Sequence, residues 1–250
     1  MELAGRVALV TGASSGIGHA LAVALARREV QVKATGRDDD ALERLSSSTG
    51  AEALSADLRD SDAVERVSTW ARPVDILVNN AGLGWAGSFG QMTPHDIEEL
   101  IRVNLTAAVR LTRTLLPEMI DRGVGRVVNV SSIAGHVGVG HEAVYTATKA
   151  ALIAFSDSLR YELAGTGVGV TVVSPGVVDT PFFARAGRRY TRSFPKMIKP
   201  ERVASAIVRA LERDAPEIFV PGWMVLPARL RGSWPALYRR LASRFGSGYS

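Results

Sequence analysis

The sequence predicts an α/β fold in which a doubly wound parallel sheet of about seven strands carries helices on both faces. Short apolar runs alternate along the chain with longer segments of helical periodicity, which is the pattern of successive βαβ units. The 250 residues suit one such domain, and 46% of them are hydrophobic, enough for a sizeable core. Cysteine is absent, which excludes disulfide frameworks, thiolate metal sites and a cysteine nucleophile.

The expected strands are short runs rich in valine, isoleucine and alanine and bounded by turn residues. In chain order they are 7–10, 30–34, 51–55, 76–79, 126–130, 170–173 and 218–220. The expected helices lie between them, where apolar residues recur at intervals of three and four. In chain order they are 17–27, 39–45, 62–71, 95–122, 144–163 and 200–212, the last beginning at a proline that suits a first helical turn.

Two of these helices suggest an oligomer. The segments 95–122 and 144–163 are long and carry apolar residues on more than one side. A second apolar face is often buried against another subunit, so a homodimer or a homotetramer is expected. The segment 180–199 contains two prolines and four aromatic residues and is expected to be a flap rather than a linker.

The start of the sequence does not match a signal peptide, because it lacks a basic segment followed by a long apolar stretch. No window approaches the roughly 18 uninterrupted apolar residues of a membrane span. A cytoplasmic protein is therefore expected.

Residues 1–222 are expected to form a single domain, and residues 223–250 a basic amphipathic extension of it. The extension holds five arginines and no acidic residue. Without those five, the 30 basic residues of the chain fall to 25, which equals its 25 acidic residues. A neutral body without a basic stripe argues against nucleic acid as a partner.

Apolar residues alternate with the arginines of the extension. They are Leu226, Leu230, Trp234, Leu237, Tyr238, Leu241 and Phe245. Two interpretations follow from this pattern. The extension packs on its own body or on a partner subunit and caps a pocket, or it makes weak contact with an anionic membrane surface.

A glycine-rich loop follows the first expected strand and opens the first expected helix. Its glycines fall in the order G-x-x-x-G-x-G, a variant of the dinucleotide-binding fingerprint. Glycine permits the tight turn and lets backbone N–H groups approach a pyrophosphate at the helix N-terminus. The loop therefore predicts a Rossmann-type nucleotide site. Its residues are Gly12, Ser14, Ser15, Gly16, Ile17 and Gly18.

Tyr145 and Lys149 are four residues apart, so on a helix they share one face. A free tyrosine has a pKa of about 10, too high for a base at neutral pH. A neighbouring ammonium group stabilises the phenolate and lowers this pKa, which brings proton transfer within reach. The pair is therefore a candidate for acid–base catalysis.

Five motifs together resemble those of the short-chain dehydrogenase/reductase family. They are TGASSGIG at 11–18, Asn79-Asn80-Ala81-Gly82, Ser132, Tyr145-x-x-x-Lys149 and Pro175-Gly176. The resemblance covers roughly residues 5–220 in the family's order and spacing. It implies an oxidoreductase that acts on CH–OH donors with NAD(P) as acceptor, with Tyr145 as the acid/base.

The resemblance assigns catalytic roles to four side chains. They are Asn104, Ser132, Tyr145 and Lys149. Ser132 is preferred to its neighbour Ser131 because it lies 13 residues before Tyr145, the family's spacing, and it would hydrogen-bond the substrate oxygen. Lys149 would also hold the nicotinamide ribose. Asn104, unfavourable in the middle of a helix, would relay protons through water to Lys149.

The end of the second expected strand bears on the choice of nucleotide. NAD-specific members of the family carry an Asp where Gly36 stands, and an arginine such as Arg37 accommodates a 2′-phosphate. NADP(H) is therefore expected to be preferred over NAD(H), although the acidic residues at 38–40 could weaken the preference. The resemblance adds further cofactor-binding residues. They are Asp57 and Leu58 at the adenine, Asn80, Ala81, Gly82, Tyr145, Lys149, Pro175 and Gly176 along the cofactor, and Val178 and Thr180 at the nicotinamide.

The expected reaction is NADPH-dependent reduction of a hydrophobic aldehyde or ketone, or the reverse oxidation of a secondary alcohol. The segments 83–89 (with Trp85 and Phe89), 133–144 and 180–199 are expected to wall the substrate pocket, and they are mostly apolar. His136 and His141 lie in that region and are expected to contact substrate, since no third ligand supports a metal site.

Other interpretations stay open. The chain continues past 222, where acyl-carrier-protein reductases of the family end, which argues against that substrate and against the family's standard tetramer. Epimerases and dehydratases of related folds usually run longer. A non-catalytic NADP(H)-binding sensor or scaffold is the alternative outside enzymes, and it usually lacks the Tyr or the Lys that are present here.

Overall fold

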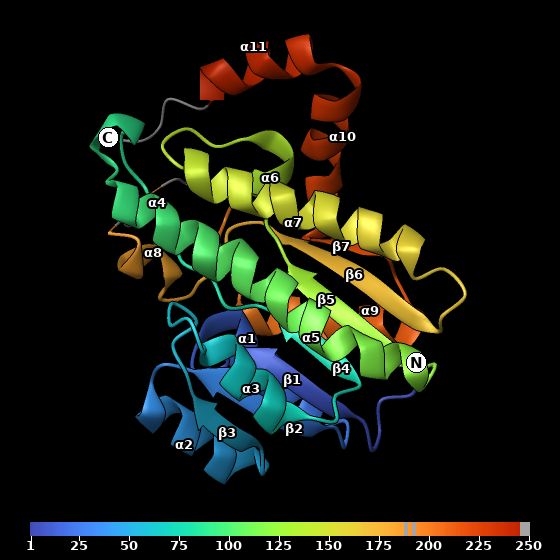
Figure 1. Ribbon diagram of the computed structural model, residues 1–250. Coiled ribbons are helices and arrows are strands. Elements are labelled where there is room, and N and C mark those ends of the chain that lie inside the picture. Colours follow the sequence, from blue (N-terminus) through green and yellow to red (C-terminus); the bar gives the residue numbers. More distant parts are fainter. Residues whose placement is uncertain (188–189, 192–193, 246–250) are drawn as a thin grey trace.

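The computed structural model describes residues 1–187, 190–191 and 194–245, and within them seven strands form one parallel sheet (Figure 1). The strands are β1 (Val7–Thr11), β2 (Gln31–Gly36), β3 (Glu52–Ser55), β4 (Ile76–Asn79), β5 (Gly125–Val130), β6 (Val168–Pro175) and β7 (Glu217–Val220). Their order across the sheet is β3-β2-β1-β4-β5-β6-β7, and every neighbouring pair is parallel. The predicted fold class is confirmed.

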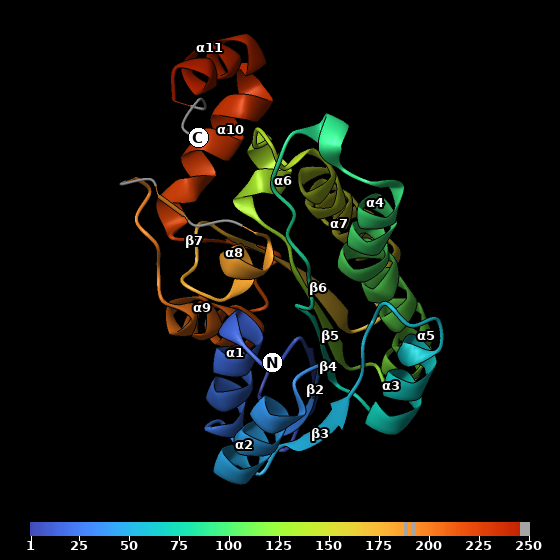
Figure 2. The same ribbon diagram turned by 90° about the vertical axis from the view of Figure 1, so that its left-hand side faces the viewer.

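Helices cover both faces of the sheet (Figure 2). One face carries α1 (Gly16–Ala26), α2 (Asp39–Thr49) and α9 (Pro200–Arg213). The other carries α3 (Ala63–Ala71), α5 (Ala107–Asp121) and α7 (Ala143–Glu162). Because both faces are covered, the inner strands are apolar on both sides, as the continuous runs of valine and isoleucine predict.

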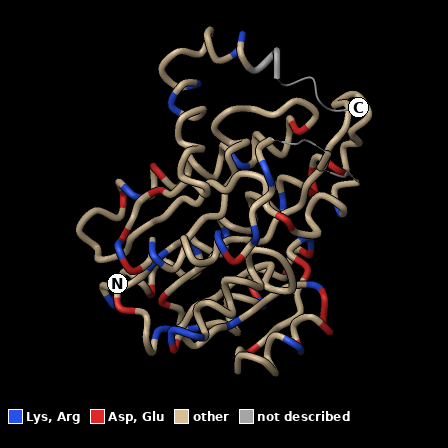
Figure 3. The backbone as a smooth tube through the Cα atoms, turned by 180° about the vertical axis from the view of Figure 1, so that it is seen from behind, with Lys and Arg blue, Asp and Glu red and all other residues tan. Residues whose placement is uncertain are grey.

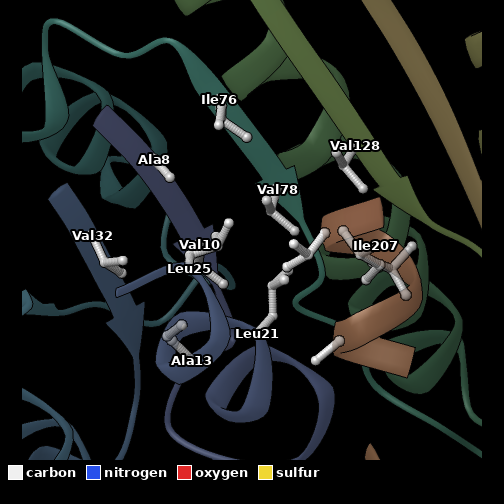
Figure 4. Close-up of a cluster of buried hydrophobic side chains, with 14 of the residues drawn as sticks. Ala8, Val10, Ala13, Leu21, Leu25, Val32, Ile76, Val78, Val128 and Ile207 are labelled. Carbon is white, nitrogen blue, oxygen red and sulfur yellow. The ribbon is translucent and has the colours of Figure 1, made fainter. Parts of the chain in front are cut away.

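The larger core lies between the sheet and the pair α1 and α9. Leu21 and Leu25 of α1 and Ile207 of α9 are fully buried and meet Val10 and Val78 of the two central strands (Figure 4). Burying a branched side chain of this size contributes about 1.5–3 kcal/mol. This packing fixes α1 against β1 and so fixes the loop that joins them.

The order of the strands reverses at β1 and β4. Val10 of β1 pairs with Ala34 of β2 on one side and with Val78 of β4 on the other. The chain leaves β1 and β4 toward opposite faces of the sheet, which opens a crevice at the carboxyl ends of these two strands.

The helix predicted over 95–122 is interrupted by a π-helical turn. The segment begins as α4 (Pro94–Ile101), passes through the π-turn Arg102–Thr106 and continues as α5. A π-turn has no signal in apolar periodicity, because it adds a residue without changing the composition of the buried face. It carries the buried side chain of Asn104.

Smaller differences concern short elements and helix ends. The helix predicted over 39–45 extends to Thr49, because its end is set by Gly50 in the left-handed conformation (φ +74°). Two helices of four and five residues, α8 (Phe182–Arg185) and α6 (Ile133–Val137), were too short for a periodic pattern to predict. The predicted flap contains α8, but its residues 188–189 and 192–193 lie outside the described residues.

The C-terminal extension forms two helices, α10 (Val225–Ser233) and α11 (Pro235–Phe245). They lie at one end of the molecule, and α10 packs beside α6 (Figures 1 and 2). In the described part of the chain, no helix has the length and apolar character needed to cross a bilayer.

The buried contact between α1 and α9 yields a stability prediction. Ile207→Ala removes a side chain that is 0% exposed, and Leu226→Ala removes one of the same size at a position that is 63% exposed. The free energy of unfolding is expected to fall by about 2–5 kcal/mol for Ile207→Ala and by about 1 kcal/mol or less for Leu226→Ala. Denaturant titration measures both. Equal losses in the two variants would contradict the assignment of the core.

Candidate active site

A cavity of about 1220 Å³ opens at the carboxyl ends of the strands, where their order reverses. Most residues predicted to bind cofactor or substrate line it. They are Gly12, Ser14, Ser15, Gly16, Ile17, Arg37, Asp57, Leu58, Asn80, Ala81, Gly82, Ser132, Tyr145, Lys149, Pro175, Gly176, Val178 and Thr180. Two predicted residues, Gly18 and Asn104, lie behind the wall of the cavity.

The glycine loop is shaped by close backbone approach. Gly12 has φ +66°, and a Cβ there would lie 2.9 Å from the Cα of Ala81. A Cβ on Gly18 would lie 2.4 Å from the carbonyl oxygen of Gly12. Gly18 therefore allows the start of α1 to pack on the turn, and the remaining loop residues keep their backbone open to the cavity. A loop of this shape at a helix N-terminus fits a dinucleotide pyrophosphate.

A hydrogen-bond network ties the glycine loop to the end of β4. The Thr11 hydroxyl donates to the carbonyl of Val78 at 3.1 Å and accepts from the N–H groups of Asn80 and Ala81, both at 3.0 Å. The Asn80 amide donates back to the carbonyl of Thr11 at 2.9 Å. The two loops that border the cofactor site are thereby held at one separation.

The side chain of Arg37 lies at the far end of this site, 3.7 Å from the Asp57 carboxylate and about two-fifths exposed. Asp57 also binds Arg59 at 2.6 Å. Burial raises the pKa of Asp57, but the hydrogen bonds and charge of Arg59 and the charge of Arg37 together hold it below its usual value. Nearby, Asp38 accepts from the N–H of Ala41 as the cap of α2, so one of the three acids after Arg37 is engaged locally.

Tyr145 lies on α7 and is almost fully buried beside the cavity. Burial raises the pKa of its hydroxyl, and the charge of Glu142 raises it further, while a hydrogen bond with Ser132 lowers it. The balance is a raised pKa, so the expectation that Lys149 lowers it is wrong for this structure. The reason is burial: the loss of solvation of the phenolate outweighs the hydrogen bond with Ser132.

Lys149 lies one turn further along α7 and is also buried. Its Nζ donates to the carbonyl of Val130 at 2.9 Å and lies 5.8 Å from the centre of the Tyr145 ring. Burial lowers the pKa of Lys149 to about 8. Ser131 uses its hydroxyl to donate to the Lys149 carbonyl at 2.8 Å, which leaves Ser132 as the serine that bonds to Tyr145.

Ser132 is placed by α6, which it caps by accepting from the N–H of Ala134 at 3.1 Å. Asn104 occupies the π-turn behind the cavity wall. Its amide oxygen accepts from the N–H of Leu83 at 2.7 Å, and its nitrogen donates to the Leu83 carbonyl at 2.9 Å and to Thr148 at 3.2 Å. These bonds hold the loop after β4 in place, and the proton relay stays a prediction.

Arg185 was not predicted from the sequence as a site residue. Its guanidinium donates to the Ser15 hydroxyl at 3.0 Å, so α8 of the flap brings a positive charge to the glycine loop. No local pattern marks this residue, because 170 positions separate the two partners. The aromatic side chain of Phe182, whose ring centre is 5.5 Å from that of Tyr145, was expected only as part of the flap.

Several predicted pocket residues lie elsewhere. His136 shares a hydrogen bond with Ser174 at 2.8 Å and packs on Phe219, outside the cavity lining. His141, Trp85 and Phe89 line a separate pocket of about 190 Å³. The expectation that these residues contact substrate in the main cavity is therefore wrong. Within the described part of the chain, no group of three or more His, Asp or Glu side chains could hold a metal ion.

Comparison with known proteins agrees with this geometry. A family model for short chain dehydrogenases matches residues 6–191. The ketoacyl reductase HetN of Nostoc sp. is 37% identical over 227 residues, which cover 87% of this chain and 79% of HetN. A short-chain dehydrogenase from Sphingobium yanoikuyae, solved in complex with NADPH, has a TM-score of 0.82 at 31% identity, with 98% of this chain and 97% of that chain covered.

A second solved structure bears on the fold alone. A short chain dehydrogenase/reductase from Burkholderia phymatum, in complex with NAD, has a TM-score of 0.85 at 24% identity, with 95% of this chain and 96% of that chain covered. The family match includes the glycine loop, the π-turn and the Tyr145–Lys149 pair. The chain is thus a member of the short-chain dehydrogenase/reductase family, an oxidoreductase that uses a nicotinamide cofactor.

Proposed function

We propose that this protein reduces an apolar aldehyde or ketone with NADPH and that Tyr145 supplies the proton. The observation that carries the proposal is the position of Tyr145: its side chain is buried at the edge of the cavity, its hydroxyl is hydrogen-bonded with Ser132, and burial raises its pKa. A protonated phenol in a dry site is suited to donate to an oxygen that becomes negative. The same groups serve the reverse oxidation of a secondary alcohol.

The cofactor would lie along the first half of the cavity. The glycine loop and Arg185 would hold its pyrophosphate, Arg37 its 2′-phosphate, and Asp57 and Leu58 its adenine. By resemblance to the family, further residues of the cavity wall would contact the cofactor. They are Asn80, Ala81, Gly82, Lys149, Pro175, Gly176, Val178 and Thr180. When bound, the nicotinamide supplies the hydride.

The substrate oxygen would sit between the hydroxyl groups of Ser132 and Tyr145. Ser132 donates a hydrogen bond that stabilises charge on this oxygen, and Tyr145 Oη transfers its proton to it. Lys149, whose Nζ donates to the Val130 carbonyl, would return a proton to Tyr145. Asn104 would complete this proton relay.

The rest of the substrate would occupy an apolar space. Beyond Tyr145 the cavity is walled by Phe182 and Phe183 of α8, and by Tyr190, Leu230 and Tyr238. Such a lining favours a hydrophobic carbonyl compound over a sugar or a charged acid. A long apolar chain is compatible with it, and HetN, a relative over most of this chain, is named a ketoacyl reductase.

A homodimer or homotetramer is proposed because Ile101 of α4, Ile120 of α5 and Tyr161 of α7 expose apolar surface on one layer of the fold.

The alternative of a non-catalytic NADP(H)-binding protein has no specific support. Asn104 and the three side chains at the cavity, Ser132, Tyr145 and Lys149, are all present.

Replacing Tyr145 tests the proton donor. Tyr145→Phe is expected to lower turnover by about 10²–10⁴-fold, because the ring stays and only the acidic proton is lost. Turnover is measured as NADPH consumption with a series of aldehydes and ketones of increasing size. Tyr161→Phe, at a position that is 80% exposed, is the matched control. Full turnover by Tyr145→Phe, with NADPH binding unchanged, would overturn the assignment.

Replacing Arg37 tests the preference for NADPH. Arg37→Gln is expected to weaken NADPH binding by about tenfold or more, since a charge-assisted hydrogen bond to phosphate contributes about 1.5–3 kcal/mol. NADH binding should change little. Dissociation constants for both dinucleotides are measured for the native protein, for Arg37→Gln and for Arg44→Gln, an exposed arginine on α2. Equal affinity of the native protein for NADPH and NADH would refute the preference.

Lys149 predicts a dependence of stability on pH. Its pKa is about 8 in the folded protein against 10.5 for an ordinary lysine, so between these values the unfolded chain binds more protons. The stability contributed at this site therefore rises as the pH increases through that window, and it is lowest below about pH 8.

Lys149→Met is therefore expected to raise the free energy of unfolding at neutral pH by about 1–3 kcal/mol, even after loss of the bond to Val130. The substitution should also flatten the rise in the free energy of unfolding between about pH 8 and 10. Thermal unfolding of the cofactor-free protein across this range is the measurement, with Lys196→Met at an exposed position as control. An unchanged pH profile in Lys149→Met would count against a buried ammonium.

A further inference from the structure

We propose that exposed side chains of α10 and α11, together with Phe194 and Trp223, form a docking surface for an anionic lipid bilayer at the mouth of the substrate cavity. We call it the tail face. Its apolar members are Phe194, Trp223, Leu226, Trp234, Leu237 and Leu241. Arginines of α10 and α11 stand among them.

Exposed apolar side chains are concentrated on the tail face. Of the eleven large hydrophobic side chains that are exposed in the described part of the chain, six are the members of the tail face. Leu226 is 63% exposed and Trp234 is 65% exposed. Scattered apolar residues on a protein surface need no explanation, but a contiguous group marks an interaction site.

The tail face continues into the cavity. Phe194 and Trp223 are stacked, with ring centres 5.4 Å apart and planes at 21°, and both are exposed while also lining the cavity. Leu241 does the same from α11. Three side chains of the tail face therefore also form part of the cavity wall.

The charge of the tail face selects an anionic partner. Arg229, Arg231, Arg239 and Arg240 are exposed on α10 and α11, and no acidic residue occurs from 223 to 250. Figure 3 shows basic residues without acidic ones along these helices. The five arginines of residues 223–250, which include Arg244, account for the whole net charge of +5, because the rest of the chain is neutral. Basic side chains attract the negative surface of a bilayer.

A second copy of the chain is a poorer partner for the tail face. A twofold contact would bring the arginines of one copy against those of the other, with no carboxylate from this segment to pair them. Lipid headgroups supply the missing negative charge, and tryptophan and arginine suit the boundary between headgroups and acyl chains. Since no described helix can span the bilayer, the contact is peripheral.

Docking in this way would let an apolar carbonyl compound pass from the bilayer into the cavity without crossing water. That consequence rests on the proposed reaction, whereas lipid binding does not. The test therefore measures binding and turnover separately.

The binding test is co-sedimentation of the full-length protein with vesicles of phosphatidylcholine alone or mixed with phosphatidylglycerol. The native protein is expected to bind the anionic vesicles, less so at high salt, and the neutral ones weakly. Leu226→Ser with Trp234→Ser, and separately Arg229→Gln with Arg239→Gln, should each lower the apparent affinity by roughly tenfold or more.

Matched controls make the same changes elsewhere. Phe89→Ser removes an aromatic residue that is 61% exposed and lies outside the tail face, and Arg44→Gln with Arg209→Gln removes two exposed arginines of the body. Both should bind vesicles like the native protein. Circular dichroism and turnover of a small water-soluble ketone check that every variant folds and works.

Three results would overturn the proposal. The first is absence of binding to anionic vesicles, and the second is equal binding by the native protein and both tail-face variants. The third is self-association of the native protein that the tail-face variants lose, in the absence of lipid binding.

In the turnover test, anionic vesicles should stimulate reduction of a long-chain ketone by the native protein but not by the variants. Vesicle binding without reduction of any carbonyl would refute the proposed reaction and leave the docking surface standing.

Discussion

The hydroxyl of Thr11 links the glycine loop to the end of β4, and the rest of the site depends on this link. It bonds to the carbonyl of Val78 and to the two N–H groups that follow β4, so the carboxyl ends of β1 and β4 cannot drift apart. Gly12 and Ala81 then approach more closely than any side chain at Gly12 would allow. The floor of the cofactor site is thus made of backbone, and its width is set by a single buried hydrogen-bond network.

The proposed acid–base pair of Tyr145 and Lys149 depends on a second constraint, which is the burial of both side chains. Burial acts on both members of the pair in the direction of neutrality: it keeps the proton on Tyr145 and lowers the pKa of Lys149. The Val130 carbonyl and the Ser132 hydroxyl replace part of the lost hydration. A site of this kind sacrifices stability for reactivity, because two ionisable groups occupy positions where apolar residues would pack better.

The sequence predicted the features that depend on residues close together in the chain. Alternating apolar runs predicted the sheet, and the glycine spacing and the Tyr145–Lys149 interval predicted residues that all reach one cavity except Gly18. Features that depend on contacts distant in sequence were not predictable. The bond between Arg185 and Ser15, the π-turn at Asn104 and the turning of His136 toward Ser174 arise from packing between elements. The raised pKa of Tyr145 belongs to the same group, because it reflects burial rather than its neighbour in the helix.

The first C-terminal helix, α10, is only partly covered by the rest of the protein. No residue of α10 is buried, although it packs on α6 and lines the cavity through Pro227 and Leu230. A helix of nine residues is marginal in water without a buried apolar face. Its side chains are at most partly buried, and Leu226 is 63% exposed. The stability of α10, and with it the shape of the apolar half of the cavity, therefore depends on its contacts with α6 and α11.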